Sequence, residues 1–402
     1  MKVLFVKESL LWPRASGHDV HCFHMMQALS RIGIEVSLLT GLRCLPKSVE
    51  NAGLQSQWIF SDLERAETPV QLTRLQGKFC SYWGTNKDRI SQISDLVKSQ
   101  NFNAVVVVGL DVLPYLASLP ATVHRIWYAA DEWFLHHWSQ IKFGNPNTWS
   151  ELKFGLIKGL YEYAFTRCTD RVWVVSSKDA SAIRWVMPRS AVDVIANGVD
   201  ADHFHAASVD IEPSAIDSQG LVFWGRLDFG PNLDAIQWFC QNVWTRLRRT
   251  RPEIRWTVYG FQAGTAVRSL AEKYEFDLVP DLPDLRSEIL KHRVVVLPFV
   301  SGAGIKNKFL EAAAMSRPIV ASRRALNGVD LKGGQPCLVA QSADQWINHI
   351  SRLIDDAEER AGLGQRARDW VVKNYSWDHA GALAMKSLAA PAVRAAPVEH
   401  DV

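Results

Sequence analysis

Short apolar runs that suit strands alternate with segments that suit helices along most of this chain of 402 residues. The run at residues 105–109 contains no polar side chain, which is typical of a parallel strand buried on both faces of its sheet. Other strands are expected at 3–6, 35–40, 122–129 and 172–176, and helices at 20–31 and 150–166. This alternation predicts an α/β domain with a doubly wound parallel sheet.

The alternation begins again after residue 200, so a second domain of the same class is expected. A chain of 402 residues is also too long for one ordinary hydrophobic core. Strands are expected at 220–224, 255–260, 294–298 and 318–321, and helices at 232–249, 265–274, 306–315, 343–356 and 358–374. The predicted organisation is one domain over 1–195, a second over 196–375, a helix over 376–390 and a frayed tail over 391–402.

The composition argues against several classes of protein. The formal net charge is only +3, so nucleic acid is not expected as a partner. The six cysteines are scattered without a C-x-x-C pair, which argues against a zinc knuckle or a disulfide framework and fits a reducing compartment. Lys7 and Glu8 interrupt the first apolar run, so it does not resemble a signal peptide, and no stretch of about 20 apolar residues could span a membrane. We therefore expect a cytoplasmic protein.

The segment VVVLPFVSGAGIKNKFLEAAAMSRPIVAS, residues 294–322, combines a strand, a glycine-containing loop and a helix. Gly302 and Gly304 would let the backbone approach a ligand closely, and the N–H groups at the start of a helix favour phosphate oxygens. Lys306 and Lys308 add positive charge at the same place. The segment therefore suits a diphosphate.

Glu311 lies three residues after Lys308 and so shares its face of the expected helix, where it could accept hydrogen bonds from ribose hydroxyls. Lys306 and Lys308 would be about 200° apart on a helix, so Lys306 should point away if the helix already includes it. The alternative interpretation is an exposed helix with an ordinary Lys–Glu pair.

This segment resembles the C-terminal signature of the GT4 family of retaining glycosyltransferases, in its variant G-x-G-I-K-N-K-x-L-E-A. The resemblance continues along nearly the whole chain. It includes IANGVD at 195–200 followed by Phe204, VFWGRLDFGPNLDAIQWF at 222–239, YSWDHAGALAMKSL at 375–388, and Gly17 in the loop after the first strand. The resemblance implies a GT-B fold, in which two Rossmann-like domains face a cleft and a C-terminal helix crosses back to the first domain. The first domain would serve the acceptor and the second the nucleotide-sugar donor.

The resemblance also implies roles for individual residues. Arg226 would neutralise the donor diphosphate, for which the guanidinium fork is well suited, and Glu311 would bind the ribose. Catalysis would involve Arg226, Lys308 and Asp131. The donor would be bound by Gly17, Asn197, Arg226, Gly302, Gly304, Lys306, Lys308 and Glu311. Because protein cations would hold the phosphates, neither a metal nor a further cofactor is expected.

Three positions depart from the family pattern. A second glutamate that contacts the donor sugar is replaced by Ala303, and a lysine near the diphosphate by Pro231. The histidine of a His–Asp pair is replaced by Ala130, so only Asp131 can be carried over. Two alternatives therefore stay open beside the transferase: a catalytically silent scaffold that binds a nucleotide sugar or a protein, and a nucleotide-sugar epimerase. The nucleotide, the sugar and the acceptor are not identified by the sequence.

The cluster AADEWFLHHWSQ at 129–140 is a further candidate. His136 and His137 beside carboxylates suggest a metal site, but neighbouring side chains point to different faces of a helix or strand, which is poor ligand geometry. Tryptophans and lysines in and after the cluster resemble a membrane-interface surface, which would favour peripheral contact at the inner face of the membrane. They are Trp133, Trp138, Trp149, Lys142, Lys153 and Lys158. The alternative is that the tryptophans pack in the core or shape an acceptor site.

Overall fold

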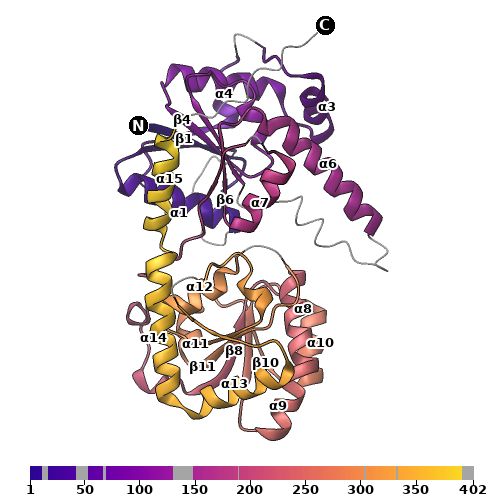
Figure 1. Ribbon diagram of the computed structural model, residues 1–402, viewed down its shortest axis with the longest axis vertical. Helices are drawn as coiled ribbons and strands as arrows, with labels where there is room; N and C mark the ends of the chain where they lie inside the picture. Colours follow the sequence, from indigo (N-terminus) through magenta and orange to yellow (C-terminus); the bar gives the residue numbers. More distant parts are fainter. Residues whose placement is uncertain are drawn as a thin grey trace. The chain divides into compact units, whose positions relative to one another are not determined.

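The computed structural model describes residues 1–10, 17–41, 53–66, 69–129, 148–188, 190–302, 305–331 and 334–391. The chain divides into two compact units (Figure 1). The first comprises Met1–Asn197 and Trp377–Val402, and the second comprises Gly198–Ser376. The last helix thus belongs to the first unit, although the chain reaches it from the second.

The first unit is built on a seven-stranded sheet with the order β3-β2-β1-β4-β5-β6-β7. All of its strand pairs are parallel. The strands are β1 (Lys2–Lys7), β2 (Glu35–Thr40), β3 (Ser56–Ile59), β4 (Ala104–Val108), β5 (His124–Ala129), β6 (Arg171–Val174) and β7 (Val192–Val194). The chain builds the sheet outwards from β1 in one direction and from β4 in the other, which is the doubly wound arrangement.

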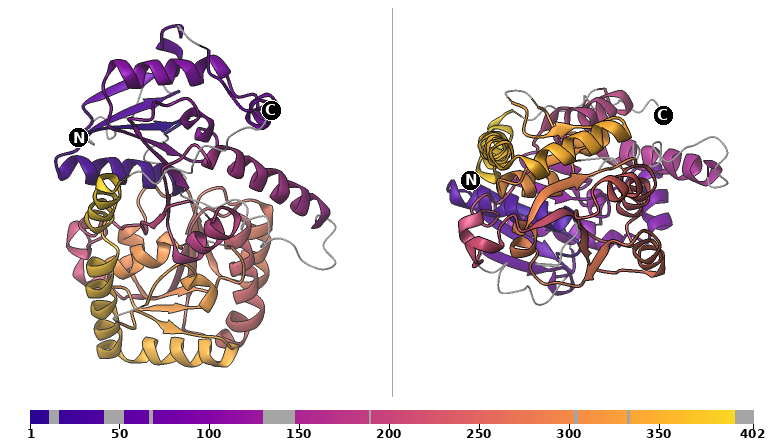
Figure 2. Two further views of the ribbon diagram at one scale, coloured as in Figure 1. Left: turned by 45° about the horizontal axis from the view of Figure 1, so that its top comes forward. Right: turned by 90° about the horizontal axis from the view of Figure 1, so that it is seen from below.

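Helices cover both faces of this sheet (Figure 2). They are α1 (Gly17–Arg31), α3 (Arg74–Trp83), α4 (Lys87–Ser99), α6 (Thr148–Thr166), α7 (Ser177–Val186) and α15 (Trp377–Ala389). Alternate residues of the strands point to opposite faces, so Phe5 and Val106 pack in a core with α1 and α15, while Val6 and Val107 pack in another with α4 and α6. The contact between α1 and α15 is close, since a Cβ at Gly381 would lie 2.9 Å from Ala28 Cβ.

The second unit contains a six-stranded parallel sheet with the order β10-β9-β8-β11-β12-β13. Its strands are β8 (Gln219–Trp224), β9 (Trp256–Gly260), β10 (Asp277–Pro280), β11 (His292–Leu297), β12 (Ile319–Ala321) and β13 (Leu338–Val339). Its helices are α8 (Gly230–Phe239), α9 (Thr245–Thr250), α10 (Thr265–Tyr274), α11 (Arg286–Leu290), α12 (Asn307–Ala314), α13 (Ala343–Asp355) and α14 (Ala357–Asn374). In this sheet the strands β8, β9 and β10 are added in one direction and β11, β12 and β13 in the other, so the direction of winding reverses between β8 and β11.

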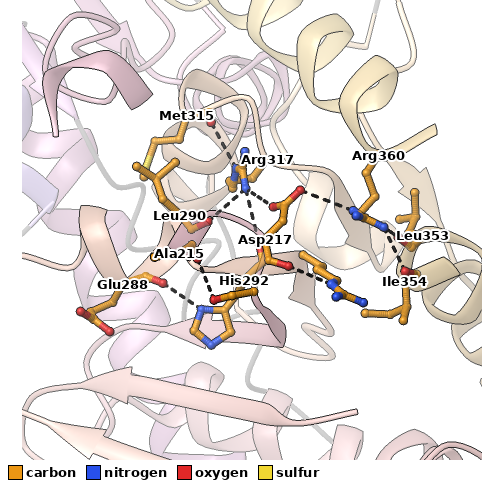
Figure 3. Close-up of polar contacts among 12 residues, drawn as sticks. Ala215, Asp217, Glu288, Leu290, His292, Met315, Arg317, Leu353, Ile354 and Arg360 are labelled. Atoms are coloured by element: carbon orange, nitrogen blue, oxygen red, sulfur yellow. Dashed lines mark hydrogen bonds and ion pairs between the residues drawn. The ribbon is translucent and has the colours of Figure 1, made fainter. Parts of the chain in front are cut away.

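An ion-pair network of two buried arginines and the partly exposed Asp217 lies at the edge of this sheet at which β8, β11 and β12 begin (Figure 3). Asp217 Oδ1 accepts a hydrogen bond from Arg317 Nη1 at 2.7 Å, and Asp217 Oδ2 lies 3.5 Å from Arg360 Nε. Arg360 also donates to the carbonyl groups of Leu353 and Ile354, where α13 ends. The network therefore ties three chain segments together at the edge opposite the strands' carboxyl ends, and we assign it a structural role.

The predicted fold class, with two parallel-sheet α/β domains and a final helix on the first of them, is confirmed. The helix expected over 232–249 is present but is interrupted by a π-helical turn at Cys240–Trp244. The short strands at the ends of the order in each sheet, β3, β7, β10 and β13, were not predicted. They carry fewer buried apolar residues than the central strands, so periodicity identifies them poorly.

Candidate functional site

The strand order of the second unit indicates where a ligand would bind. In doubly wound sheets, ligands bind beyond the carboxyl ends of the strands at the point where the winding reverses. That point is the neighbouring pair β8 and β11, whose carboxyl ends lie at the same edge because the strands are parallel. The chain leaves β8 through Gly225 and Arg226, and β11 through the loop that leads to α12. These two loops form the candidate site.

Lys308, in the first turn of α12, lies directly against the end of β8. A Cβ at Gly225 would be only 2.6 Å from both Cε and Nζ of Lys308, so a larger residue at 225 would displace the lysine. Gly225 also has a φ of 145°, which side chains disfavour. The Lys308 ammonium lies 5.7 Å from the ring centre of Phe223 and 5.6 Å from that of Phe299. A positive charge is thus held between two aromatic rings at the switch point.

Glu311 follows one turn later on the same face, as predicted from spacing. The buried Trp224, the last residue of β8, donates its indole N–H to Glu311 Oε2 at 3.1 Å. This bond fixes the carboxylate at the end of the strand. No role for Trp224 was predicted from the sequence, although the residue lies within the segment at 222–239 that carries the family resemblance.

Burial shifts the pKa values of both charged groups in opposite directions. It lowers the pKa of Lys308 from 10.5 to about 8, and the nearby Glu311 carboxylate partly opposes that change. Burial also raises the pKa of Glu311, while Lys308 and the Trp224 hydrogen bond oppose the rise. The Lys308 ammonium and the Glu311 carboxylate are therefore each destabilised by their surroundings. Such perturbed groups are typical of sites that bind a charged ligand.

Arg226 reaches the same edge from the β8 loop. Its side chain is 54% exposed, and its Nε donates to Asp228 Oδ1 at 2.7 Å. The guanidinium carbon lies 5.9 Å from the ring centre of Phe229. The backbone of this loop is held by Asn232, whose side-chain amide donates to the Arg226 carbonyl oxygen at 2.7 Å. The arginine side chain thus extends from an anchored loop.

The structure corrects the expectation for Lys306. The helix begins at Asn307, and Lys306 precedes it with extended backbone angles of φ −89° and ψ 102°. Because Lys306 is not helical, its direction relative to Lys308 does not follow from the 200° separation expected on a helix. The Lys306 ammonium lies 5.5 Å from the ring centre of Phe299, the same ring that Lys308 approaches, so both lysines converge on one place.

Gly302, in the loop after β11, lies close to Pro231 in the first turn of α8. It has a φ of 90°, and a Cβ there would lie 3.1 Å from Pro231 Cβ and 3.2 Å from Lys306 Nζ. The Lys306 ammonium is therefore close to Pro231, the position at which the family pattern has a lysine.

The other predicted site residues are distributed as follows. Gly17 begins α1, and the buried Asn197 follows β7, so both belong to the first unit. Asp131 and Gly304, with the departures Ala130 and Ala303, lie outside the described residues. The structure therefore brings together Arg226, Gly302, Lys306, Lys308 and Glu311, all in the second unit.

Two further features concern metals and membranes. Within the described ranges, no group of three or more His, Cys, Asp or Glu side chains is arranged to hold a metal ion. The described helices include none that is both long enough and apolar enough to cross a membrane. The His136–His137 cluster and the tryptophans Trp133 and Trp138 lie outside the described residues.

Comparison with known proteins agrees with this location. The family model described as "Glycosyl transferases group 1" matches residues 218–356, and this segment contains the candidate site. No curated protein sequence matches the chain significantly.

Solved glycosyltransferase structures are similar over the whole length. HepE from Anabaena, solved with UDP-glucose, is 14% identical with a TM-score of 0.65 over 96% of this chain and 99% of that one. Sucrose-phosphate synthase from Thermosynechococcus elongatus is 14% identical with a TM-score of 0.67 over 96% and 98%. A variant of S. aureus TarM, solved with fondaparinux, alpha-GlcNAc-glycerol and UDP, is 10% identical with a TM-score of 0.65 over 97% and 100%. At these identities the likeness establishes the fold, which is GT-B.

Proposed function

We propose that this protein is a glycosyltransferase that moves a hexosyl group from a nucleotide diphosphate sugar to an acceptor. The observation that carries the proposal is the Lys308–Glu311 pair at the reversal between β8 and β11, within the segment that matches the glycosyltransferase group 1 family model. A partly buried cation and a carboxylate fixed one turn apart match a ligand that has a diphosphate next to a ribose. As in the GT4 family that the sequence resembles, we propose transfer with retention of anomeric configuration.

In this proposal the donor lies with its diphosphate between Arg226 and the two lysines. Arg226 supplies a guanidinium fork for phosphate oxygens, and the ammonium groups near Phe299 supply two point charges. Lys306 supplies the positive charge that the family pattern places at the position of Pro231. Glu311 accepts hydrogen bonds from the ribose hydroxyls. Because these cations compensate the diphosphate, the reaction needs no bridging metal.

The reaction breaks the bond between the sugar's anomeric carbon and the β-phosphate oxygen, and it forms a bond from that carbon to the acceptor oxygen. The acceptor hydroxyl passes its proton to the departing β-phosphate oxygen, which gains negative charge as the bond breaks, and the nucleoside diphosphate leaves. Negative charge on the leaving group grows as the bond breaks, so cations fixed beside it favour the transition state over the ground state. With a pKa of about 8, Lys308 is about ten parts protonated to one part neutral at pH 7 and can serve this purpose.

The test is a thermal-shift screen of UDP-, GDP-, dTDP- and ADP-sugars, followed by measurement of nucleotide release. UDP-sugars come first, because HepE was solved with UDP-glucose. A ligand that binds the native state raises the melting temperature. A transferase releases nucleoside diphosphate faster when acceptor is present. A scaffold would bind the donor and release nothing, and an epimerase would convert the sugar without an acceptor; either result would refute the proposal.

We also propose peripheral contact with an anionic membrane through the face formed by α3 and α6. These helices touch: Gln76 Nε2 donates to the Ala164 carbonyl oxygen at 3.0 Å. Large exposed apolar side chains are concentrated on them, namely Leu75, Tyr82, Trp83, Phe154, Leu156, Leu160 and Tyr163. The charged side chains described as exposed on the same helices, Arg74, Lys78 and Lys153, are all basic. Apolar and basic groups together complement an anionic lipid surface.

Sedimentation with vesicles tests this contact. The protein should sediment with vesicles that contain phosphatidylglycerol, and Leu156→Ser with Leu160→Ser should reduce the bound fraction. Val372→Ser, at an exposed apolar position on α14, is the control. Equal sedimentation of all three proteins would contradict the assignment of this face.

A further inference from the structure

Asn232 is a buried polar residue at the candidate site to which neither the sequence motifs nor the proposed donor contacts assign a role. It lies in the first turn of α8, and only 3% of its surface is exposed. A polar side chain buried to this degree is costly unless its hydrogen bonds are satisfied. The contacts of its amide therefore show what the residue does.

Both ends of the Asn232 amide are used. Its Oδ1 accepts a hydrogen bond from Lys308 Nζ at 3.2 Å, and its Nδ2 donates to the Arg226 carbonyl oxygen at 2.7 Å. The opposite orientation of the amide would place NH₂ against an ammonium and oxygen against a carbonyl. The two neighbours thus fix the amide in one orientation, and the amide fixes the distance between them.

Gly225 makes this arrangement possible. A Cβ at that position would lie 3.0 Å from Asn232 Nδ2 and 2.6 Å from Lys308 Nζ. The amide and the ammonium therefore lie close to the backbone at the end of β8, in space that another residue would fill. The lysine, the asparagine and the arginine loop form one packed unit.

The chemistry of the amide matters as much as its position. A carboxylate at 232 would hold Lys308 equally well, but it would neutralise the positive charge and raise the pKa of the lysine. A neutral amide fixes the ammonium and leaves its charge available to a ligand. Among the described residues, charged groups near Lys308 include Glu311 on the same helix and Lys306 at the same aromatic ring.

We propose that Asn232 is a positioning residue that links the Arg226 loop to the Lys308 ammonium and keeps the charge of that ammonium available for the donor diphosphate. This inference rests on the proposed function for its ligand, but the Asn232–Lys308 contact can be tested without any ligand.

The first measurement is therefore made on the protein alone. The pKa of Lys308 is determined by NMR titration of lysine side chains in protein with ¹³C- and ¹⁵N-labelled lysine, and the signal is assigned with Lys308→Gln. Asn232→Asp, which keeps the size of the side chain, should raise this pKa by about 1 unit or more, because opposite charges at this distance have effects of that size. Asn242→Ala is the matched control, since its amide also donates to a backbone carbonyl in the same helical run without touching the site. It should leave the pKa unchanged.

The second measurement is the affinity for UDP, GDP, dTDP and ADP, by calorimetry at pH 7. Asn232→Asp should weaken binding of the preferred diphosphate by about tenfold or more, with a smaller loss for the corresponding monophosphate, since the change acts on phosphate contacts. Asn232→Ala should also weaken binding of the diphosphate. Circular dichroism shows whether each variant is folded, and affinities are compared per folded molecule.

The possible outcomes distinguish the role of Asn232 from the proposed glycosyltransferase function. An unchanged Lys308 pKa in Asn232→Asp overturns the contact, and a changed pKa with wild-type diphosphate affinity overturns the positioning role. If the wild-type protein binds none of the four diphosphates, the proposed function fails and the role toward a donor fails with it. The NMR titration then still decides whether Asn232 holds Lys308.

Discussion

Lys308 keeps its charge in a place that disfavours charge. Its pKa is about 8 in the folded protein and 10.5 in a free side chain. One pKa unit corresponds to about 1.4 kcal/mol, so protonated Lys308 costs the folded state about 3 kcal/mol at pH 7. Because the folded pKa lies below the unfolded one, this cost is complete below pH 8, shrinks as the pH rises towards 10.5 and is absent above that value.

Lys308→Met should therefore stabilise the protein at pH 7. Methionine keeps an unbranched side chain without the charge, and it loses the hydrogen bond from the ammonium to the buried Asn232, which is worth about 2 kcal/mol because the donor is charged. The expected net gain is about 1 kcal/mol in the free energy of unfolding, or about 2–4 °C in the melting temperature of a domain of this size. The same variant should lose affinity for nucleoside diphosphates.

Urea unfolding at pH 7 and pH 10 measures the gain in the free energy of unfolding and shows whether the charge of Lys308 is its cause. At pH 10 most of the cost has disappeared in the wild-type protein, so the advantage of Lys308→Met should largely vanish. Lys273→Met on α10, at an exposed position, controls for the general effect of removing a lysine. A variant that is less stable than wild type at pH 7, or whose gain is equal at both pH values, would refute the reasoning.

Three further predictions concern the rest of the second unit. Glu311→Gln should weaken donor binding by about 10- to 100-fold in calorimetry, because hydrogen bonds to a charged group contribute about 1.5–3 kcal/mol, while circular dichroism stays unchanged; unchanged affinity would make Glu311 structural. Asp217→Asn leaves Arg317 and Arg360 without their carboxylate, and it should lower the free energy of unfolding by about 3 kcal/mol in urea without changing donor affinity per folded molecule; an effect on affinity instead of stability would contradict its structural assignment. Turnover should survive EDTA, and loss of activity that Mg²⁺ or Mn²⁺ restores would disprove compensation of the diphosphate by protein cations.

The sequence predicted the fold best in segments where a single hydrophobic pattern dominates. The apolar runs of β1, β4, β8 and β11 predict central parallel strands, and the structure places them at the centres of the two sheets. The switch point between β8 and β11 was not predicted, because the apolar pattern gives the order of strands along the chain but not their order in the sheet. Short strands at the sheet edges were missed because their burial is incomplete.

Within the site, spacing predicted that Lys308 and Glu311 share one face of α12, and the structure confirms their proximity. The predicted helix start at Lys306 was one residue too early, because the start of a helix depends on local backbone geometry that residue order alone does not fix. The condition under which Lys306 would point away from Lys308 is therefore not met. Trp224 and Asn232 were missed for another reason. Their roles arise from contacts between strand β8, helix α8 and helix α12, and such contacts exist only once the sheet has formed.

In the proposed function, the edge of the sheet at β8 and β11 recognises a nucleoside diphosphate through Lys308. Calorimetry with UDP, UMP and uridine, and with the corresponding guanosine, thymidine and adenosine series, tests it directly on the wild-type protein and on Lys308→Met. We expect one diphosphate to bind at least about tenfold more tightly than its monophosphate, and we expect Lys308→Met to abolish this difference while remaining folded. Equal binding of diphosphate and monophosphate by the wild-type protein, or an unchanged preference in Lys308→Met, would contradict it.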